Sequence, residues 1–127
     1  MIKILFVNPD EKFVQIYARP LTQHFQLDSA HDGLTALRKF KLNLPALVVS
    51  DYHLPLLSGL GLLKHLRSQK ESSAIPFIFL TDHPDRSEAL GHGASDWISL
   101  ETSSPDLLIE KIYHHLTLNK WRINQLN

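Results

Sequence analysis

Short apolar runs alternate along this chain with segments in which apolar residues recur at helical spacing. A short, nearly continuous apolar run between polar turn residues is typical of a strand buried on both faces of a sheet. The pattern predicts five strands, near residues 2–7, 25–30, 46–50, 76–80 and 97–98.

A helical pattern follows each of the five predicted strands. The segments lie near residues 11–25, 34–42, 59–66, 82–90 and 105–116. Pro20 should kink or end the first helix, and Pro84 falls in the first turn of the fourth. Ser58 and Ser104 are predicted to cap the third and fifth helices, with Pro105 at the first helical position.

Regular alternation of strand and helix predicts an α/β fold, in which a parallel sheet is covered by helices on both faces. The pattern shows no repeat and no interdomain linker. We therefore expect one domain over residues 1–127, with a core at about 1–118 and a C-terminal extension, or the start of a linker, at 119–127.

Polar residues gather where the predicted strands end. The clusters are Asn8-Pro9-Asp10, Asp51, Thr81-Asp82 and Ser99-Leu100-Glu101. In open α/β sheets, ligand and catalytic groups lie at the carboxyl ends of the strands. The sequence therefore predicts a site at this edge, with Asp51 as its most informative carboxylate.

Composition removes several classes of function. Cysteine is absent, which excludes disulfides, thiolate catalysis and Cys-ligated zinc. Thirteen basic residues balance thirteen acidic ones, so charge alone would not attract nucleic acid or an anionic membrane. We see no signal peptide and no apolar run long enough to span a membrane, and we expect a cytoplasmic protein.

The segment around Asp51 resembles the phosphoacceptor motif of response-regulator receiver domains. It reads VVSDYHLPLLSG, with Leu54-Pro55 and Gly59 at the spacing of that motif. Four further segments are similar to receiver motifs: KILFVNPD, AHDGLTAL, IPFIFLT and GASDWIS. The resemblance implies a flavodoxin-like, doubly wound five-stranded parallel sheet in the order 2-1-3-4-5, within a single three-layer α/β/α domain.

The resemblance also implies roles for individual residues. Asp51 falls on the phosphoacceptor, Thr81 on the hydroxyl residue that senses the phosphoryl group, and Trp97 on the aromatic switch position. The residues leave simpler alternatives open: Thr81 could also cap the following helix, and Trp97 could serve core packing as readily as partner contact.

The chain departs from the receiver pattern at three positions of the pocket. Asn8 and Pro9 stand where the family usually has two acidic residues that hold Mg²⁺, and Leu100 stands where the family has a lysine. Mg²⁺ needs at least one or two carboxylates. Asp51 and the backbone carbonyl of His53 would form a poor metal site, unless Asp10 supplied a second carboxylate. Since these positions lie where strands open into loops, we expect none of Asn8, Pro9 and Leu100 to be deeply buried.

These observations predict a receiver-like signalling module of a two-component or phosphorelay system that acts by protein contacts. We expect no enzymatic turnover and no catalytic residues, with Mg²⁺ as a cofactor only if the pocket functions. The expected partner is a histidine kinase or another signalling protein. A homodimer would use the face formed by residues 82–90, 96–99 and 104–118, with Trp97 and Tyr113 as its anchors.

Two rival interpretations remain at this point. The first is a competent receiver, phosphorylated on Asp51 by a histidine kinase with Asp10 assisting the metal. The second is a flavodoxin-like small-molecule binder, which the lack of a glycine- or hydroxyl-rich phosphate cradle disfavours. Eight histidines show no metal-binding spacing, so we expect them to be solvated.

Overall fold

The chain folds around a five-stranded parallel sheet with the strand order β2-β1-β3-β4-β5. The computed structural model describes residues 1–82 and 85–126, with side chains as far as residue 120. The strands are β1 (Lys3–Val7), β2 (Gln26–Ala30), β3 (Leu47–Ser50), β4 (Phe77–Thr81) and β5 (Asp96–Ser99). All four neighbouring pairs are parallel, so the predicted fold class and strand order are confirmed.

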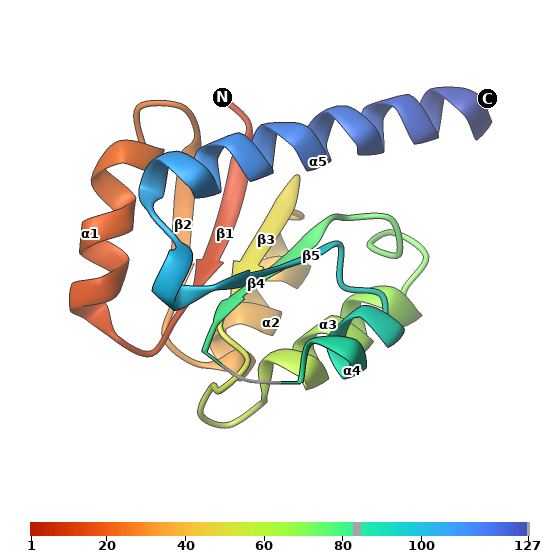
Figure 1. Ribbon diagram of the computed structural model, residues 1–127. Helices are drawn as coiled ribbons and strands as arrows, with labels where there is room; N and C mark the ends of the chain where they lie inside the picture. Colours follow the sequence, from red (N-terminus) through yellow and green to blue (C-terminus); the bar gives the residue numbers. More distant parts are fainter. Residues whose placement is uncertain (83–84, 127) are drawn as a thin grey trace.

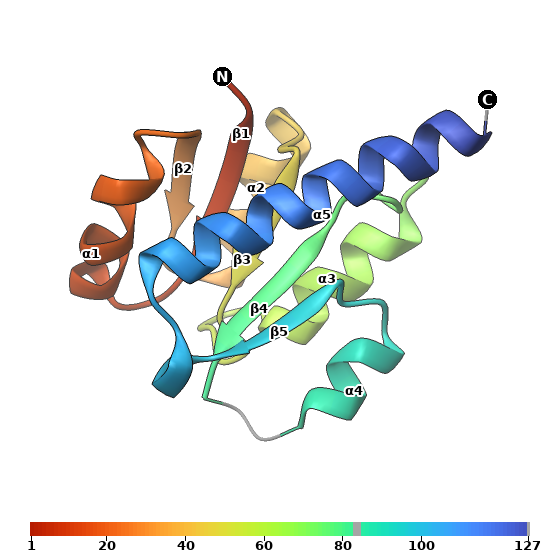
Figure 2. The same cartoon turned by 45° about the horizontal axis from the view of Figure 1, so that its top comes forward.

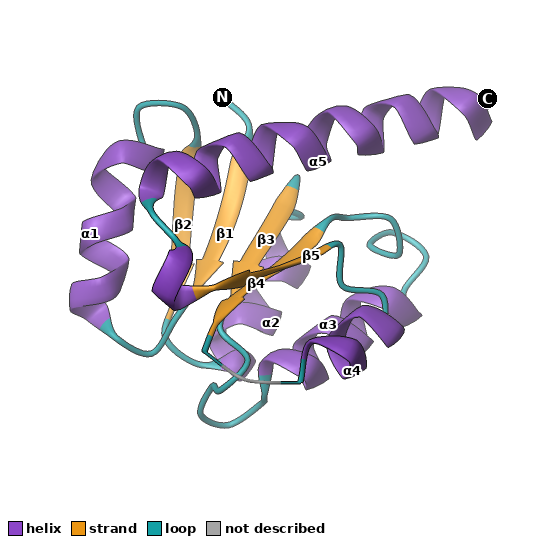
Figure 3. Cartoon of the chain, viewed as in Figure 1, coloured by secondary structure: helices purple, strands orange, loops and turns teal. Residues whose placement is uncertain are grey.

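Helices cover both faces of the sheet, which gives three layers (Figures 1 and 3). The helices are α1 (Glu11–Leu21), α2 (Gly33–Leu42), α3 (Gly59–Ser68), α4 (Arg86–Gly91), the short 3-10 helix η1 (Leu100–Thr102) and α5 (Pro105–Leu126). Helices α1 and α5 lie on one face, and α2, α3 and α4 lie on the other (Figure 2). Within the described residues, no helix combines the length and hydropathy required to cross a membrane.

Short polar side chains determine where several helices begin. Ser58 Oγ accepts a hydrogen bond from the amide of Gly61, and Ser104 Oγ accepts one from Leu107, which confirms both predicted caps. Asp32 caps α2, and the backbone and hydroxyl hydrogen bonds from Thr35 lower the pKa of Asp32.

Helix α4 begins later than the sequence predicts. Its cap is Asp85, whose carboxylate accepts a 3.0 Å hydrogen bond from the Glu88 amide, whereas Asp82 is not helical. Two aspartates three residues apart both fit the pattern of an N-cap, and among the described contacts it is Asp85 that accepts from a helix amide. The predicted placement of Pro84 lies outside the described residues.

The ends of α1 and α5 also differ from their predicted positions. Helix α1 stops at Leu21, one residue after Pro20, and not near Phe25; Pro20 has no amide hydrogen to donate to Ile16, which weakens the last turn. Helix α5 continues without a break to Leu126. Its last turns run past the edge of the sheet (Figures 1 and 2).

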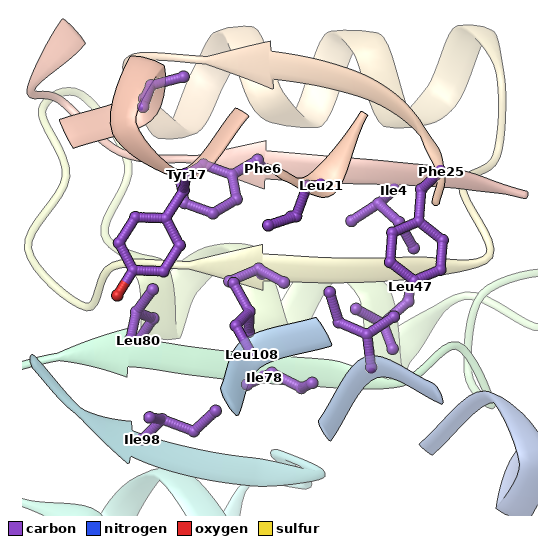
Figure 4. Packing of buried hydrophobic residues seen from close by; sticks show 13 residues of the cluster. Ile4, Phe6, Tyr17, Leu21, Phe25, Leu47, Ile78, Leu80, Ile98 and Leu108 are labelled. Carbon is purple, nitrogen blue, oxygen red and sulfur yellow. The ribbon is translucent and has the colours of Figure 1, made fainter. Parts of the chain in front are cut away.

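Apolar side chains form one core cluster on each face of the sheet. The cluster under α1 and α5 contains Phe6, Leu21, Phe25, Ile78 and Leu108, which are almost completely buried (Figure 4). The cluster under α2, α3 and α4 contains Leu5, Phe40, Leu62, Leu66, Phe77 and Phe79. Because both faces are covered, the central strands are apolar throughout rather than alternating.

Two glycines allow the loop after β3 to pack closely against its neighbours. A Cβ atom on Gly33 would lie 1.8 Å from the carbonyl oxygen of Leu57, and one on Gly59 would lie 2.2 Å from that of Asp51. The Gly33 amide donates a 3.1 Å hydrogen bond to the Pro55 carbonyl. The glycines therefore hold this loop beside the carboxyl end of the sheet.

Candidate functional site

The candidate site lies at the carboxyl ends of β1, β3, β4 and β5. Val7 at the end of β1 pairs with Ser50 at the end of β3, and Thr81 pairs with Ser99 across β4 and β5. Asn8, Asp51 and Leu100 are the residues that directly follow three of these strands. All four predicted polar clusters therefore lie at the same edge of the sheet.

Asp51 and Thr81 are in direct contact at this edge. The Thr81 hydroxyl donates a 2.7 Å hydrogen bond to Oδ1 of Asp51, and the amide of His53 donates a 3.2 Å bond to the same oxygen. The Asp51 amide donates to the carbonyl of Val7, which fixes the backbone beside β1. Thr81 is fully buried while Asp51 is partly exposed, so the carboxylate is held from within and open to solvent.

The side chains of Asn8 and Asp10, after β1, form hydrogen bonds with nearby backbone amides. Asn8 has only 5% of its surface exposed, and its Oδ1 accepts a 2.8 Å hydrogen bond from the amide of Asp10. The Asp10 carboxylate accepts from the amides of Lys12 and Phe13, as the cap of α1. The expectation that Asn8 is not deeply buried was therefore wrong, because this side chain forms the inner part of the loop. Pro9 is exposed as expected.

Leu100 opens η1 immediately after β5. Its side chain is partly buried and packs against the cluster under α1 and α5. In the described part of the chain, the lysines that form ion pairs are Lys3 and Lys39, both with Asp28, and Lys111 with Asp96. No ion pair with Asp51 is found among these residues.

Residues that could hold a metal are few at this edge. Asp51, the carbonyl of His53 and Asp10 are the predicted ligands, and one Asp10 oxygen already accepts two helix amides. Within residues 1–82 and 85–126, no three acidic or histidine side chains come together in a group able to bind a metal ion.

Trp97 packs beside the site on the face of the sheet that carries α4. Its ring is partly buried, with centroids 5.6 Å from Phe79 and 6.0 Å from Tyr52. The side chain belongs to the core cluster under α2, α3 and α4. Both alternatives for Trp97, core packing and partner contact, therefore remain compatible with its position.

Tyr52 is a residue whose position the sequence did not predict. Its hydroxyl donates a 2.9 Å hydrogen bond to Oε1 of Glu88 on α4. Partial burial and this hydrogen bond to the Glu88 carboxylate raise the pKa of Tyr52 to about 12. The one sequence feature that pointed to Tyr52 was its position directly after Asp51. Because it lies in a loop, the periodicity of the sequence could not predict which side chain it contacts.

The expected pairing of Trp97 with Tyr113 on one surface was wrong. Tyr113 lies on the other side of the sheet, where its ring is 5.0 Å from that of Phe25 and its hydroxyl is 3.0 Å from Nδ1 of His24. The two aromatic side chains thus belong to different faces, because Trp97 points to the face under α2, α3 and α4, whereas α5 covers the opposite face.

The expectation of solvated histidines was also wrong for His115. Its side chain is only 12% exposed, and its Nε2 lies 2.7 Å from Oδ2 of Asp96. His31 is more exposed and pairs with Glu11. These contacts join neighbouring elements: β5 to α5, and the end of β2 to α1.

The chain matches known receiver proteins over most of its length. The family model described as response regulator receiver domain matches residues 4–113. The phosphate regulon transcriptional regulatory protein PhoB of Rhizobium meliloti is 30% identical over 113 residues, which cover 85% of this chain and 50% of that protein. The hybrid signal transduction histidine kinase D of Dictyostelium discoideum is 28% identical over 120 residues, 92% of this chain and 8% of that protein.

A solved structure extends the similarity to three dimensions. The receiver domain of the Francisella response regulator 1452 aligns with a TM-score of 0.83 and 27% identity, over 92% of this chain and 98% of that one. The chain spans half or less of the two longer relatives. Its sequence match, its strand order and the contact of Asp51 with Thr81 converge on one conclusion: the chain belongs to the response regulator receiver domain family of two-component signalling.

Proposed function

We propose that this domain signals through protein–protein contacts, with a pocket poorly suited to Mg²⁺ binding and to phosphorylation of Asp51. The observation that carries the proposal is the replacement of three pocket groups around Asp51. Asn8 and Pro9 follow β1 in place of an acidic pair, and Leu100 follows β5 in place of a lysine. In this interpretation Asp51 keeps the phosphoacceptor position, with Thr81 and Trp97 at the switch positions.

The electrostatic consequence of these replacements is large. An acyl phosphate brings close to two negative charges, and phosphoryl transfer depends mainly on positioning and on cations that neutralise the transferred group. One charge pair at contact distance near a protein surface contributes on the order of 4 kcal/mol before desolvation is subtracted. The loss of half that amount would slow the step more than tenfold.

The geometry after β1 supports the same conclusion. One oxygen of Asp10 caps α1, which fixes the orientation of that carboxylate, and Asn8 offers an amide whose Oδ1 already accepts the Asp10 amide. A Mg²⁺ ion prefers several hard oxygen ligands in near-octahedral geometry. The donor set of Asp51 and the His53 carbonyl fits that requirement poorly.

One contact favours a second candidate, a competent receiver phosphorylated on Asp51 by a histidine kinase. The chain keeps the hydroxyl group that the receiver pattern places in the pocket. This hydroxyl, on Thr81, donates a 2.7 Å hydrogen bond to Oδ1 of Asp51. Receiver domains in general are phosphoacceptors rather than enzymes, so neither candidate implies turnover of a separate substrate.

Incubation with acetyl phosphate and Mg²⁺, followed by intact-mass measurement, separates the two candidates. The proposal expects little or no phosphoryl adduct on the wild type. Asp51→Asn is the control, because it removes the acceptor and keeps the shape of the side chain. Rapid labelling of the wild type, lost in Asp51→Asn, would establish the competent receiver.

The proposed partner is a histidine kinase or another signalling protein, or a second copy of this chain. The contact surface we propose consists of residues 82–90, 96–99 and 104–118, without Tyr113 as an anchor. Leu90 on α4 and Leu118 on α5 are 39% and 40% exposed, and both belong to this surface. We further propose that residues 1–118 form the folded core and that 119–127 extend from it.

A further inference from the structure

We propose that Tyr52 couples Asp51 to α4, so that a change at the Asp51 carboxylate reaches this helix through the contacts of Tyr52 with Glu88 and Trp97. This role is additional to those of Asp51, Thr81 and Trp97. It rests on the contacts of Tyr52 with Glu88 and Trp97, which lie far from Tyr52 in the sequence but beside it in the fold.

The backbone of Tyr52 is tied to the pocket on both sides. Asp51, its neighbour, is fixed by the Thr81 hydroxyl and by the carbonyl of Val7. The Tyr52 carbonyl accepts a 2.9 Å hydrogen bond from the amide of Gly59, the first residue of α3. Since Asp51 and Tyr52 share a peptide plane held between these bonds, a displacement of Asp51 must move the backbone of Tyr52.

The ring of Tyr52 can transmit such a movement because it is in contact with three other rings. Its centroid lies 5.4 Å from Phe79, 5.7 Å from His53 and 6.0 Å from Trp97. Phe79 is completely buried. The Tyr52 ring is partly exposed, so a change in its orientation alters its contacts with these three rings, and Trp97 is the neighbour on β5.

The hydroxyl of Tyr52 completes the connection to α4. It donates to Oε1 of Glu88 over 2.9 Å, and a hydrogen bond to an ionised acceptor is stronger than a neutral one. The pKa of Tyr52 is raised to about 12, so the hydroxyl remains a donor well above the neutral range.

Helix α4 is suited to respond because it is short and, among the described residues, buries little side-chain surface. It has six residues, and Ala89 is its buried side chain. Asp85 caps its start, and the amide of Ala94 donates to the Ala89 carbonyl at its end. A short helix with little buried surface opens locally at low free energy, so a single added contact changes its population measurably.

The proposal rests on the proposed function only in taking α4 as part of the contact surface. The coupling itself is a property of the isolated domain, and it requires neither phosphorylation nor a partner. It can therefore fail while the degenerate pocket is correct, and it can hold while the partner surface is wrong.

Hydrogen exchange of α4, measured by mass spectrometry on peptides covering residues 86–91, tests the coupling in a double-mutant cycle. The four proteins are wild type, Asp51→Asn, Tyr52→Phe and the double variant. Tyr52→Phe keeps the ring and removes the bond to Glu88, so exchange in α4 should become about fivefold faster. Asp51→Asn should change α4 exchange at least about twofold in the wild type and leave it unchanged in Tyr52→Phe.

Tyr17→Phe is the matched control. It removes a hydroxyl that lies 2.7 Å from Ser103 Oγ on the opposite face of the sheet, and it should leave the response of α4 to Asp51→Asn intact. Glu88→Ala breaks the same contact from α4 and should abolish the response as Tyr52→Phe does. The proposal is overturned if Asp51→Asn leaves α4 unchanged in the wild type, or if the response persists in both Tyr52→Phe and Glu88→Ala.

Discussion

Nε2 of His115 lies 2.7 Å from Oδ2 of Asp96, and this contact ties the middle of α5 to the first residue of β5. The amide of Trp97 donates to the other oxygen of the same carboxylate, and Lys111 lies 4.0 Å from Oδ2. Partial burial pushes the pKa of Asp96 upward, but the hydrogen bonds from His115 and Trp97, together with Lys111, outweigh it. The pKa of Asp96 is therefore lowered from its ordinary value of 3.8.

The first prediction is a pH-dependent loss of stability in Asp96→Asn. A lowered carboxyl pKa stabilises the folded state fully above the ordinary value near 3.8, and this contribution disappears as pH falls through the lower folded value. At pH 7 the variant should be less stable by roughly 1 kcal/mol. The difference should shrink as pH falls below 3.8 and vanish once the wild-type carboxyl is protonated in the folded state as well.

Urea unfolding of both proteins at pH 7 and pH 3 measures this difference. Glu110→Gln is the control, because Glu110 is an exposed residue of α5 and forms no ion pair among the described residues. An Asp96→Asn difference that stays constant over this pH range would show that the pair with His115 is not its origin.

The sequence predicted the frame of the site better than the contacts within it. Apolar runs indicated strands because both faces of each strand are buried, and parallel strands that end at one edge bring Asp51 to Thr81. The hydrogen bond between Tyr52 and Glu88 joins residues 36 positions apart. The periodicity of the sequence cannot predict such a pair, because the contact depends on how the short helix α4 is positioned against the loop after β3.

The burial of Asn8 was missed for a related reason. A polar residue after a strand is usually exposed, but the Asn8 amide donates to the carbonyl of Ala30, which draws the residue towards β2. Its side chain then accepts the amide of Asp10. Such local pairing depends on the register of two strands, which the sequence pattern leaves undetermined.

The second prediction concerns the close approach at Gly59. In Gly59→Ala the added methyl group would lie 2.2 Å from the Asp51 carbonyl oxygen and 2.9 Å from the ring of Phe79. Because a backbone atom cannot yield as a flexible side chain does, we expect destabilisation of about 3 kcal/mol or more, or failure to fold. Thermal or urea unfolding measures the loss.

Gly91→Ala provides the matched control for this substitution. Nothing lies within 4 Å of a Cβ at that position, and Gly91 is the last residue of α4. This variant should be as stable as the wild type or gain up to about 1 kcal/mol, since alanine is the better helix former. Equal losses in the two variants would contradict the close-packing explanation.

The third prediction tests the proposed contact surface. Combined Leu90→Ser and Leu118→Ser substitutions should weaken self-association or partner binding by about tenfold, because they remove apolar surface that the contact would bury. Ile16→Ser, on the 64% exposed position of α1, is the control. Sedimentation velocity over a concentration series reports self-association. If neither oligomeric state nor partner capture changes in the folded double variant, the surface is assigned wrongly.

The fourth prediction is weak Mg²⁺ binding. Trp97 packs against Tyr52 beside Asp51 and provides a local fluorescence probe, in a Trp121→Phe background that removes the second tryptophan. We expect no saturable change at Mg²⁺ concentrations of a few millimolar, since one carboxylate with a single backbone carbonyl is a poor site. A saturable change that Asp51→Asn abolishes would mean that Asp10 releases α1 and joins the metal.

The fifth prediction is that the pocket can be repaired. Asn8→Asp and Pro9→Asp restore two carboxylates, and Leu100→Lys restores an ammonium group near the end of β5. The triple variant should acquire a phosphoryl group from acetyl phosphate and Mg²⁺, on Asp51. The gain should exceed the sum of the single effects, because metal and lysine act on one transition state. Intact mass gives the yield, and the same triple variant with Asp51→Asn locates the modification.

Stability decides how the repair experiment is interpreted. Asn8 is 5% exposed and Leu100 packs partly against the core, so Asn8→Asp buries a charge and Leu100→Lys removes apolar contact. Mg²⁺ should offset part of this loss, so the triple variant should unfold at higher urea with Mg²⁺ than without it, whereas the wild type should respond little. A folded triple variant that gains stability from Mg²⁺ yet remains unlabelled would show that the three departures affect metal binding but do not account for the whole barrier to phosphorylation.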